Sequence, residues 1–402
     1  MKRSLTIIVA SLVALTGGCT SHAGEARLAF TGDIIMHIPV KNSALSHDTR
    51  ATGKKGSLNN HGFDFLFDPI RATLEESDVV VGNMEFPVSP PYNSRPFIFN
   101  CNPEVLPALR KAGFTIMHMA NNHVLDQGEQ GVRNSLSFVA RAGLGNLGVA
   151  RDETTARAGI VKEVGGMRIG FIGYTGYLNF RLPAKMNGYH LNWLYYAEDL
   201  KKDIIEMKKR CDYLVMVVHA GVEYNTLPRQ KEVDIYRQCI NDGVDLVIGH
   251  HPHLLQPAER YTAPNGREGY IFYSLGNFIS NQSTRAEAVF EGTPVTTRDS
   301  VIVKCTLTRT AARPAVRLEV IPVHTINVLE AGSGLRAIQT LSIPEEICGL
   351  KKRLAATVAK EKVDIERQLQ SLYQKIKAIQ KAVIRNGDIK GIKVRDGSSP
   401  CK

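Results

Sequence analysis

The sequence predicts an α/β protein in which sheets of parallel strands are covered by helices. Strand-like apolar segments alternate with amphipathic helical segments over most of residues 27 to 280, a pattern typical of parallel sheets flanked by helices. Polar side chains that suit metal binding follow several of these strands directly. The segments 300 to 308 and 316 to 323 alternate in polarity, which indicates antiparallel strands at the end of this region.

The elements follow in order from a first strand at residues 27 to 31. The stretch from there to Gly62 is rich in Asn, Ser, His, Lys and Gly and is predicted to be a long loop. Apolar residues at helical spacing predict a helix over 63 to 77, which leads into a strand at 78 to 81. The remaining expected elements are a helix at 103–112, a strand at 114–119, helices at 128–142 and 196–210, strands at 168–174, 213–218, 244–248 and 270–273, and a helix at 228–241.

The N-terminus has the features of an export signal. Two basic residues precede an apolar run from Leu5 to Leu15, which is too short for a membrane span. The small residues before Cys19 are similar to a bacterial lipoprotein cleavage site. We therefore expect a signal peptide at 1–18, a lipidated Cys19 with a linker to residue 26, a main domain at 27–329 and a basic helical tail at 330–402, with plain secretion as the alternative to anchoring.

The net charge of +11 is concentrated in the tail. Residues 349 to 402 hold 14 Lys and Arg against 5 Asp and Glu, whereas the body from residue 19 to 348 is balanced. A neutral body and an export signal argue against a nucleic-acid partner. The tail could contact an anionic membrane, an anionic polymer or only solvent. A heptad-like seam predicts either a short coiled coil or one amphipathic helix packed on its own domain; its residues are Ile365, Leu369, Leu372, Ile376, Ile379 and Val383.

A cluster of three histidines follows the predicted strand 244–248, at positions 250, 251 and 253. Neutral imidazole is the commonest protein ligand for zinc and related divalent ions. Pro252 stiffens the turn, so two of the rings could face one ion or two adjacent ions. A histidine-rich surface loop is the alternative for this segment taken alone.

Other polar residues occupy the same position relative to their strands. The ligand crevice of a parallel sheet lies beyond the carboxyl ends of its strands, so these residues are expected to converge. A pair of ions needs imidazoles on both sides and an anionic oxygen between them. The expected metal ligands are Asp33, Glu85, Asn122, His219, His251 and His253, the expected catalytic residues are His123 and Asp126, and the secondary candidates are His37, His250, Glu223 and Asn277.

These motifs resemble the CapA or poly-gamma-glutamate capsule biosynthesis family, which is related to calcineurin-like metallophosphoesterases. The resemblance covers about residues 27 to 325, and it implies a metallophosphatase-like sandwich of two mixed sheets flanked by helices, with a metal centre between the sheet edges. The segments that carry it are Thr31-Gly32-Asp33, Gly82-Asn83-Met84-Glu85, Ala120-Asn121-Asn122-His123 with Asp126 and Gly128, His219-Ala220-Gly221 with Glu223-Tyr224, Gly249-His250-His251-Pro252-His253 and Tyr273-Ser274-Leu275-Gly276-Asn277-Phe278.

The sequence departs from the metallophosphoesterase pattern at two positions. His37 lies four residues after Asp33, where those enzymes have Asp-x-His, and Glu85 stands where they usually have a bridging aspartate. Either departure could leave one ion, two ions or an adapted binding pocket.

The leading functional hypothesis is a protein of the cell envelope that acts in synthesis, trimming or export of an anionic capsular polymer by metal-activated hydrolysis. It would use one or two divalent ions (manganese, zinc or iron) and would act on an anionic polymer or a phosphoester, together with a capsule synthase complex. The alternatives are a polymer-binding or scaffold protein without catalysis, and a plain phosphatase unrelated to capsule.

Overall fold

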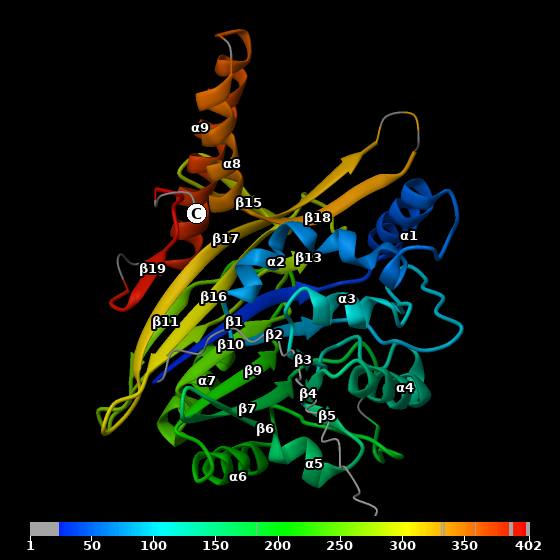
Figure 1. The fold of residues 1–402 in the computed structure, drawn as a ribbon. Coiled ribbons are helices and arrows are strands. Elements are labelled where there is room, and N and C mark those ends of the chain that lie inside the picture. The colour runs from blue at the N-terminus through cyan, green and yellow to red at the C-terminus, as the bar shows by residue number, and fades with distance from the viewer. Residues whose placement is uncertain are drawn as a thin grey trace, which may run out of the picture.

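The structure, a computed structural model, describes residues 24–181, 183–330, 332, 334–357, 359–385 and 389–398. Two mixed sheets face each other and are flanked by helices (Figure 1), which confirms the predicted fold class. The expected signal peptide and Cys19 lie outside the described residues. None of the helices in the described part of the chain is long and apolar enough to cross a membrane.

The first sheet has β1 near its middle, and its strand order is β18-β17-β16-β1-β2-β3-β4. The neighbours β1 to β4 pair in parallel, whereas β16, β17 and β18 pair antiparallel on the other side of β1. The strands are β1 (Glu25–Ile34), β2 (Val79–Met84), β3 (Ile116–His118), β4 (Gly145–Leu147), β16 (Asp299–Thr308), β17 (Ala315–Leu329) and β18 (Arg336–Ser342), with β13 (Asn277–Ile279) beside β1 and β19 (Ile392–Val394) beside β17.

The second sheet has the order β11-β12-β10-β9-β7-β6, with parallel pairing from β12 to β7 and antiparallel strands at both edges. Its strands are β6 (Ile160–Val164), β7 (Met167–Thr175), β9 (Tyr213–His219), β10 (Leu246–His250), β11 (Ala258–Thr262) and β12 (Glu268–Phe272). Two small ribbons pair β5 (Val149–Ala150) with β8 (His190–Leu191) and β14 (Glu287–Phe290) with β15 (Thr293–Thr296).

Alternation along the strands divides the core between the two faces of each sheet. In β9, Val215 and Val217 belong to the core between the sheets, while Leu214, Met216 and Val218 pack with the outer helices. Helices α6 (Ala197–Lys208) and α7 (Gln230–Asp242) cover the second sheet, and α5 (Glu153–Ala158) contacts α6. The first sheet is covered by α2 (Asp68–Glu75), α3 (Val105–Lys111) and α4 (Gly128–Arg141) with the 3-10 segment η1 (Asn59–Leu66).

The prediction of a long loop up to Gly62 was wrong, because helix α1 (Ile38–Thr52) occupies most of it. The helix buries polar side chains rather than an apolar stripe, so its sequence lacks the usual helical periodicity. Lys41 donates to the carbonyl oxygens of Tyr92 and Asn100, and Asp48 accepts from the amide of Leu58 at 2.6 Å. These internal partners replace the apolar contacts that sequence reasoning looks for.

Helices α8 (Ile343–Ala356) and α9 (Ala359–Val383) lie side by side at one end of the first sheet (Figure 1). The seam residues Ile365, Leu369, Ile376, Ile379 and Val383 are buried in the core between the sheets and these helices. This packing favours a helix that lies on its own domain over a coiled coil. The domain boundary at residue 329 stays a prediction, and the region beyond it also supplies β18 and β19 to the first sheet.

Candidate functional site

The predicted site residues gather where the strands of both sheets end. Asp33 lies at the end of β1, and Glu85 follows β2 directly. His219 and His250 close β9 and β10, which are neighbours in the second sheet. The strand ends approach one another so closely that a Cβ atom on Gly249 would collide with the carbonyl oxygen of Tyr273.

Asp33 is a fully buried carboxylate held by three side chains. Its Oδ1 accepts from Asn83 Nδ2 at 2.8 Å and lies 3.0 Å from His250 Nδ1, while its Oδ2 lies 3.1 Å from His253 Nδ1. Burial alone would raise the pKa of Asp33, but the hydrogen bonds from His250 and His253 hold it well below its usual 3.8. Asp33 is therefore an anion in the folded protein.

His253 faces oxygen atoms on its Nδ1 side. Both Asp33 Oδ2 and Asn277 Oδ1, the latter at 3.0 Å, accept a hydrogen bond there, so Nδ1 carries the proton. The lone pair of Nε2 then points toward the site, where Glu85 Oε1 lies 3.8 Å away. A carboxylate that fixes the tautomer of a histidine is the usual second partner of a metal-binding imidazole.

Glu85 is fully buried, and one of its carboxylate oxygens has no hydrogen-bond partner within the described part of the chain. Its Oε2 accepts from Asn83 Nδ2 at 3.1 Å, but Oε1 has none and lies 4.0 Å from His123 Nε2. Burial, and then the neighbouring Asp33, raises the pKa of Glu85 well above its usual 4.5. Asp33, Glu85 and His253 each place a ligand atom within 4.8 Å of the others, which fits a divalent cation.

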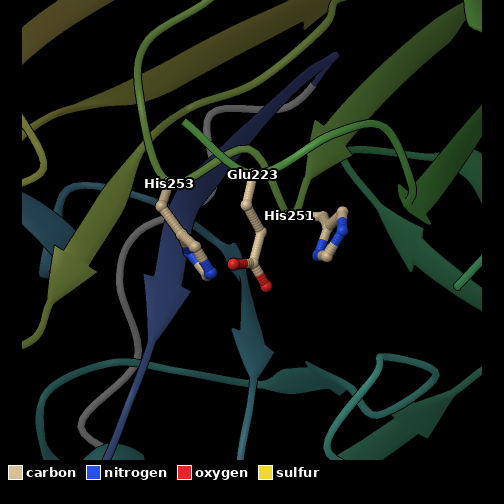
Figure 2. Close-up of side chains that lie close together, drawn as sticks. All are labelled: Glu223, His251 and His253. Atoms are coloured by element: carbon tan, nitrogen blue, oxygen red, sulfur yellow. The ribbon is translucent and has the colours of Figure 1, made fainter. Parts of the chain in front are cut away.

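A second group of ligand atoms consists of Glu223, His251 and His253, again within 4.8 Å of one another. Figure 2 shows the Glu223 carboxylate between the two imidazole rings. His251 and His253 have φ angles of 98° and 59°, a region that residues other than glycine rarely adopt and that clusters at functional sites. Burial lowers the pKa of His251 to about 3, and its buried Nδ1 lacks a partner, so a neutral ring is ready to bind a cation.

His219 and Asn122 form a hydrogen-bonded pair beside these two groups. His219 Nε2 lies 2.9 Å from Asn122 Oδ1, and its Nδ1 lies 3.2 Å from Asn83 Nδ2. Burial, and then His251, lowers the pKa of His219 well below its usual value. Both ring nitrogens of His219 face amide groups, so the ring would have to exchange one of these partners to bind an ion.

His123 and Asp126 also pair, with His123 Nδ1 2.7 Å from Asp126 Oδ2. The same oxygen accepts from the backbone N–H of Phe99 at 2.5 Å, and the Phe99 ring stacks on His123 with centroids 4.0 Å apart. The carboxylate binds the Nδ1 proton, so Nε2 is left to exchange a proton with a substrate.

Three of the secondary candidates bind site residues or ligand groups directly, and the fourth, His37, lies beside the site, with its ring centroid 4.9 Å from that of Phe99. His250 binds Asp33, Asn277 binds His253, and Glu223 belongs to the second ligand group. His37 instead accepts a hydrogen bond from the backbone of Asn281 at 3.2 Å and belongs to neither ligand group among the described residues.

Sequence reasoning missed two amides that organise the cluster. Asn83 contacts Asp33, Glu85 and His219 through one nitrogen, and its place two residues before Glu85 was a usable signal. Asn179 donates toward His123 and accepts from Asn122, but it lies in a loop without a recognisable motif.

The fold is a sandwich of two mixed sheets with a buried cluster of acids, histidines and amides at its strand ends. The family model described as "Bacterial capsule synthesis protein PGA_cap" matches residues 27–282, and the chain belongs to this family.

Two curated relatives have similar sequences. The capsule biosynthesis protein CapA of Bacillus anthracis is 28% identical over 57% of this chain and 56% of its own length. The PGA biosynthesis protein CapA of Bacillus subtilis is 31% identical over 73% of this chain and 70% of its own length. The chain thus spans little more than half of one relative and about two thirds of the other.

A solved structure with a similar arrangement comes from Staphylococcus aureus. It is a candidate 5'-nucleotidase in complex with alpha-ketoglutarate, with 14% identity and a TM-score of 0.45 over 86% of this chain and 58% of that protein.

Proposed function

We propose that this protein is a metal-dependent hydrolase of the bacterial cell envelope that acts on an anionic capsular polymer of the poly-gamma-glutamate type during its synthesis, trimming or export. One observation carries the hydrolase proposal. His253 belongs to both ligand groups, so the two groups adjoin and could hold one ion or a pair of ions. The buried atoms without partners, Glu85 Oε1 and His251 Nδ1, support this reading, because native proteins rarely leave such atoms unsatisfied.

The ions would be held by Glu85 and His253 on one side and by Glu223 and His251 on the other, and Asp33 would join the first group once its hydrogen bond to His253 opens. Manganese, zinc or iron suits this mixture of carboxylate and imidazole ligands. A bound ion would polarise a phosphoryl or carbonyl oxygen and lower the pKa of an attacking water.

The protein's own groups would then position the reactants and move protons. Asn83 holds the carboxylates of Asp33 and Glu85 in place through its side-chain nitrogen. His123 would give a proton from Nε2 to the leaving group, since Asp126 keeps the Nδ1 proton in place and stabilises the charged ring. Asn122 would serve as an amide ligand or substrate contact once its bond to His219 opens.

Substrate and location are proposed from the relatives and from the N-terminal sequence. The printed names of the two Bacillus proteins refer to capsule and PGA biosynthesis. An export signal and a lipidated Cys19 would anchor the protein at the membrane. A capsule synthase complex is the proposed partner.

The test combines elemental analysis with turnover assays. Purified protein should contain manganese, zinc or iron. It should hydrolyse a phosphoester or a gamma-glutamyl polymer, and a chelator should abolish that activity. The double variant His251→Ala with His253→Ala should lose both metal and activity, whereas Glu206→Ala on the exposed face of α6 should retain both. Protein that holds no metal, together with an unchanged cellular phenotype of the double variant, would contradict the proposal.

A second candidate function is polymer binding without catalysis. The observation in its favour is that both nitrogens of His219 are already bound by amides. The same assays separate the two candidates, because chelator-sensitive hydrolysis that is lost in Asn122→Ala would exclude a pure scaffold.

A further inference from the structure

A hollow lies beside the loops that carry the candidate metal ligands. It has a volume of about 450 Å³ and is lined by residues from two of those loops and from the C-terminal region. We infer that this hollow is a binding subsite for a carboxylate-rich chain, supplied with cations by the C-terminal region and placed beside the candidate metal centre. The inference rests on the proposed function and names where the polymer would be held.

Two walls of the hollow continue directly from metal-ligand loops. Leu227 lies four residues after Glu223, and Pro257 lies four residues after His253. Four residues of extended chain span at most about 14 Å, so each wall lies within that distance of a candidate ligand. Tyr224, next to Glu223 in the chain, has its ring centroid 5.9 Å from that of His253 and is 45% exposed.

The third wall comes from the segment that follows helix α9. It provides Arg385, Ile389 and Lys390, which lie far outside the region matched by the family model. The hollow therefore combines residues inside the region matched by the family model with residues outside it.

Arg385 is half-buried and has no carboxylate partner among the described residues. Its Nη2 donates to the carbonyl oxygen of Thr226 at 2.9 Å, and its guanidinium lies 5.2 Å from the centroid of the Phe290 ring. Burial lowers the pKa of Arg385, and no neighbouring acid offsets this effect. A positioned guanidinium without a counter-ion is suited to a carboxylate, which it can bind through two parallel hydrogen bonds.

The other charges of the hollow leave an excess of positive charge. Arg260 is paired with Glu268, and Glu259 is paired with Arg237 and the hydroxyl of Tyr273. Lys390 is exposed and has no hydrogen-bond or ion-pair partner among the described residues. Besides Arg260, Lys390 also lies near enough to Glu268 to lower the pKa of that carboxyl, but it forms no ion pair with it among the described residues. Arg385 is thus the main cation left to receive an anionic group, and Lys390 adds a second positive charge beside it.

The apolar side chains of the hollow define the ligand further. Leu227, Pro257 and Ile389 line the same hollow as the cations and offer surface to methylene groups. A polymer with a carboxylate on each unit and methylene groups between units could contact the cations through its carboxylates and the apolar residues through its methylene groups. An isolated phosphate would use only the cations.

The test measures binding of gamma-linked glutamate oligomers to the full chain by titration calorimetry. A chelator is present throughout, so that binding does not depend on a metal. The variant Arg385→Gln with Lys390→Gln should bind the oligomers about tenfold more weakly or worse, because each charge-assisted hydrogen bond contributes on the order of that factor. Binding to wild-type protein should weaken with added salt.

The matched control is Arg367→Gln with Lys362→Gln, which removes the same charges from the exposed start of α9. Arg367 and Lys362 lie roughly 27 Å and roughly 35 Å along the helix axis from Arg385, and their variant should bind within about twofold of wild type. Arg385→Lys keeps the charge but not the two parallel hydrogen bonds, so it should bind more weakly than wild type and more tightly than the glutamine variant. This partial recovery shows that loss in the glutamine variant follows from the charge and not from misfolding.

Equal oligomer affinity in wild type and in the Arg385→Gln, Lys390→Gln variant would overturn the subsite. The subsite would also be overturned if this variant lost binding to anionic phosphatidylglycerol vesicles but bound oligomers as wild type does, because the hollow would then receive lipid headgroups. Hydrolysis is scored separately with the metal-ligand variant. If the protein is inactive but still needs Arg385 and Lys390 to bind oligomers, the subsite stands and only the hydrolase proposal is refuted.

Discussion

Replacing Glu85 by glutamine tests whether this buried carboxylate is kept for a cation. In the folded protein its Oε1 has no hydrogen-bond partner, and burial raises its pKa. Glutamine would keep the oxygen that accepts from Asn83 and would place an NH2 group where Oε1 was. That group would lie 3.8 Å from His253 Nε2, which carries a lone pair because Nδ1 binds Asp33, so a small shift of the side chain would bring the NH2 group into hydrogen-bond distance.

The magnitude follows from the cost of an unsatisfied buried acceptor, about 1–3 kcal/mol. We expect the substitution to raise the free energy of unfolding of the metal-free protein by that amount. An unfolding entropy of about 2.1 cal/mol/K per residue converts it into a rise in Tm of about 1–4 °C. With saturating manganese the order should reverse, since an ion at 100 times its Kd stabilises wild type by about 2.7 kcal/mol and the variant has lost an anionic ligand.

The gain should depend on pH with a defined sign. The pKa of Glu85 lies above its usual 4.5 in the folded protein, so the native state keeps this proton to higher pH than the unfolded chain. Wild-type stability therefore falls as the pH rises from 4.5 through the raised pKa. The advantage of glutamine should grow over that window and be absent below it.

Thermal unfolding with chelator, and then with manganese, measures both effects. Glu206→Gln, a glutamate with a 56% exposed side chain on α6, is the control and should leave Tm unchanged. The reasoning fails if Glu85→Gln is less stable than wild type in chelator, or if manganese stabilises both proteins equally.

Three further predictions concern the proton donor, the amide pair and the close approach of the strands. His123→Ala should lower the hydrolysis rate about 10²–10⁴-fold with little change in polymer binding, and an unchanged kcat would remove His123 from the chemistry. Asn122→Ala should weaken manganese binding about 10–100-fold in calorimetry, and equal affinity would show that His219 needs no amide partner. Gly249→Ala should lower the free energy of unfolding by about 1–3 kcal/mol in denaturant titrations, because its Cβ would collide with the carbonyl oxygen of Tyr273. Gly349→Ala, which meets open space in helix α8, should instead stabilise by about 0.5–1 kcal/mol, and a matching loss in both glycine variants would refute the steric argument.

The hydrophobic periodicity of the sequence predicted the helices and strands that bury apolar side chains. The strands β7, β9 and β10 lie where apolar runs predicted them, and helices α4, α6 and α7 follow their amphipathic segments. Helix α1 escaped prediction because Lys41, Ser43 and Asp48 are buried through hydrogen bonds, which leave no apolar repeat in the sequence.

The residues of the candidate site could be predicted from the sequence, but the contacts between them could not. Position after a strand identified Asp33, Glu85 and the histidines, since strand ends of one sheet share an edge. Their pairing depends on side-chain directions that spacing does not encode. His250 binds Asp33 while His251 points to Glu223, and His37, the nearest histidine to Asp33 in sequence, turns to the backbone of Asn281.

The position of β1 has a consequence for when the site can form. This strand pairs in parallel with β2 on one side and antiparallel with β16 on the other, so its neighbours come from opposite ends of the chain. Asp33 cannot reach its final surroundings until His250, His253 and the neighbouring strand residue Asn277 have left the ribosome, and pairings between such distant segments form slowly. An ion could therefore be captured only after synthesis of more than half of the chain, so the compartment in which folding finishes would decide which metal is available to it.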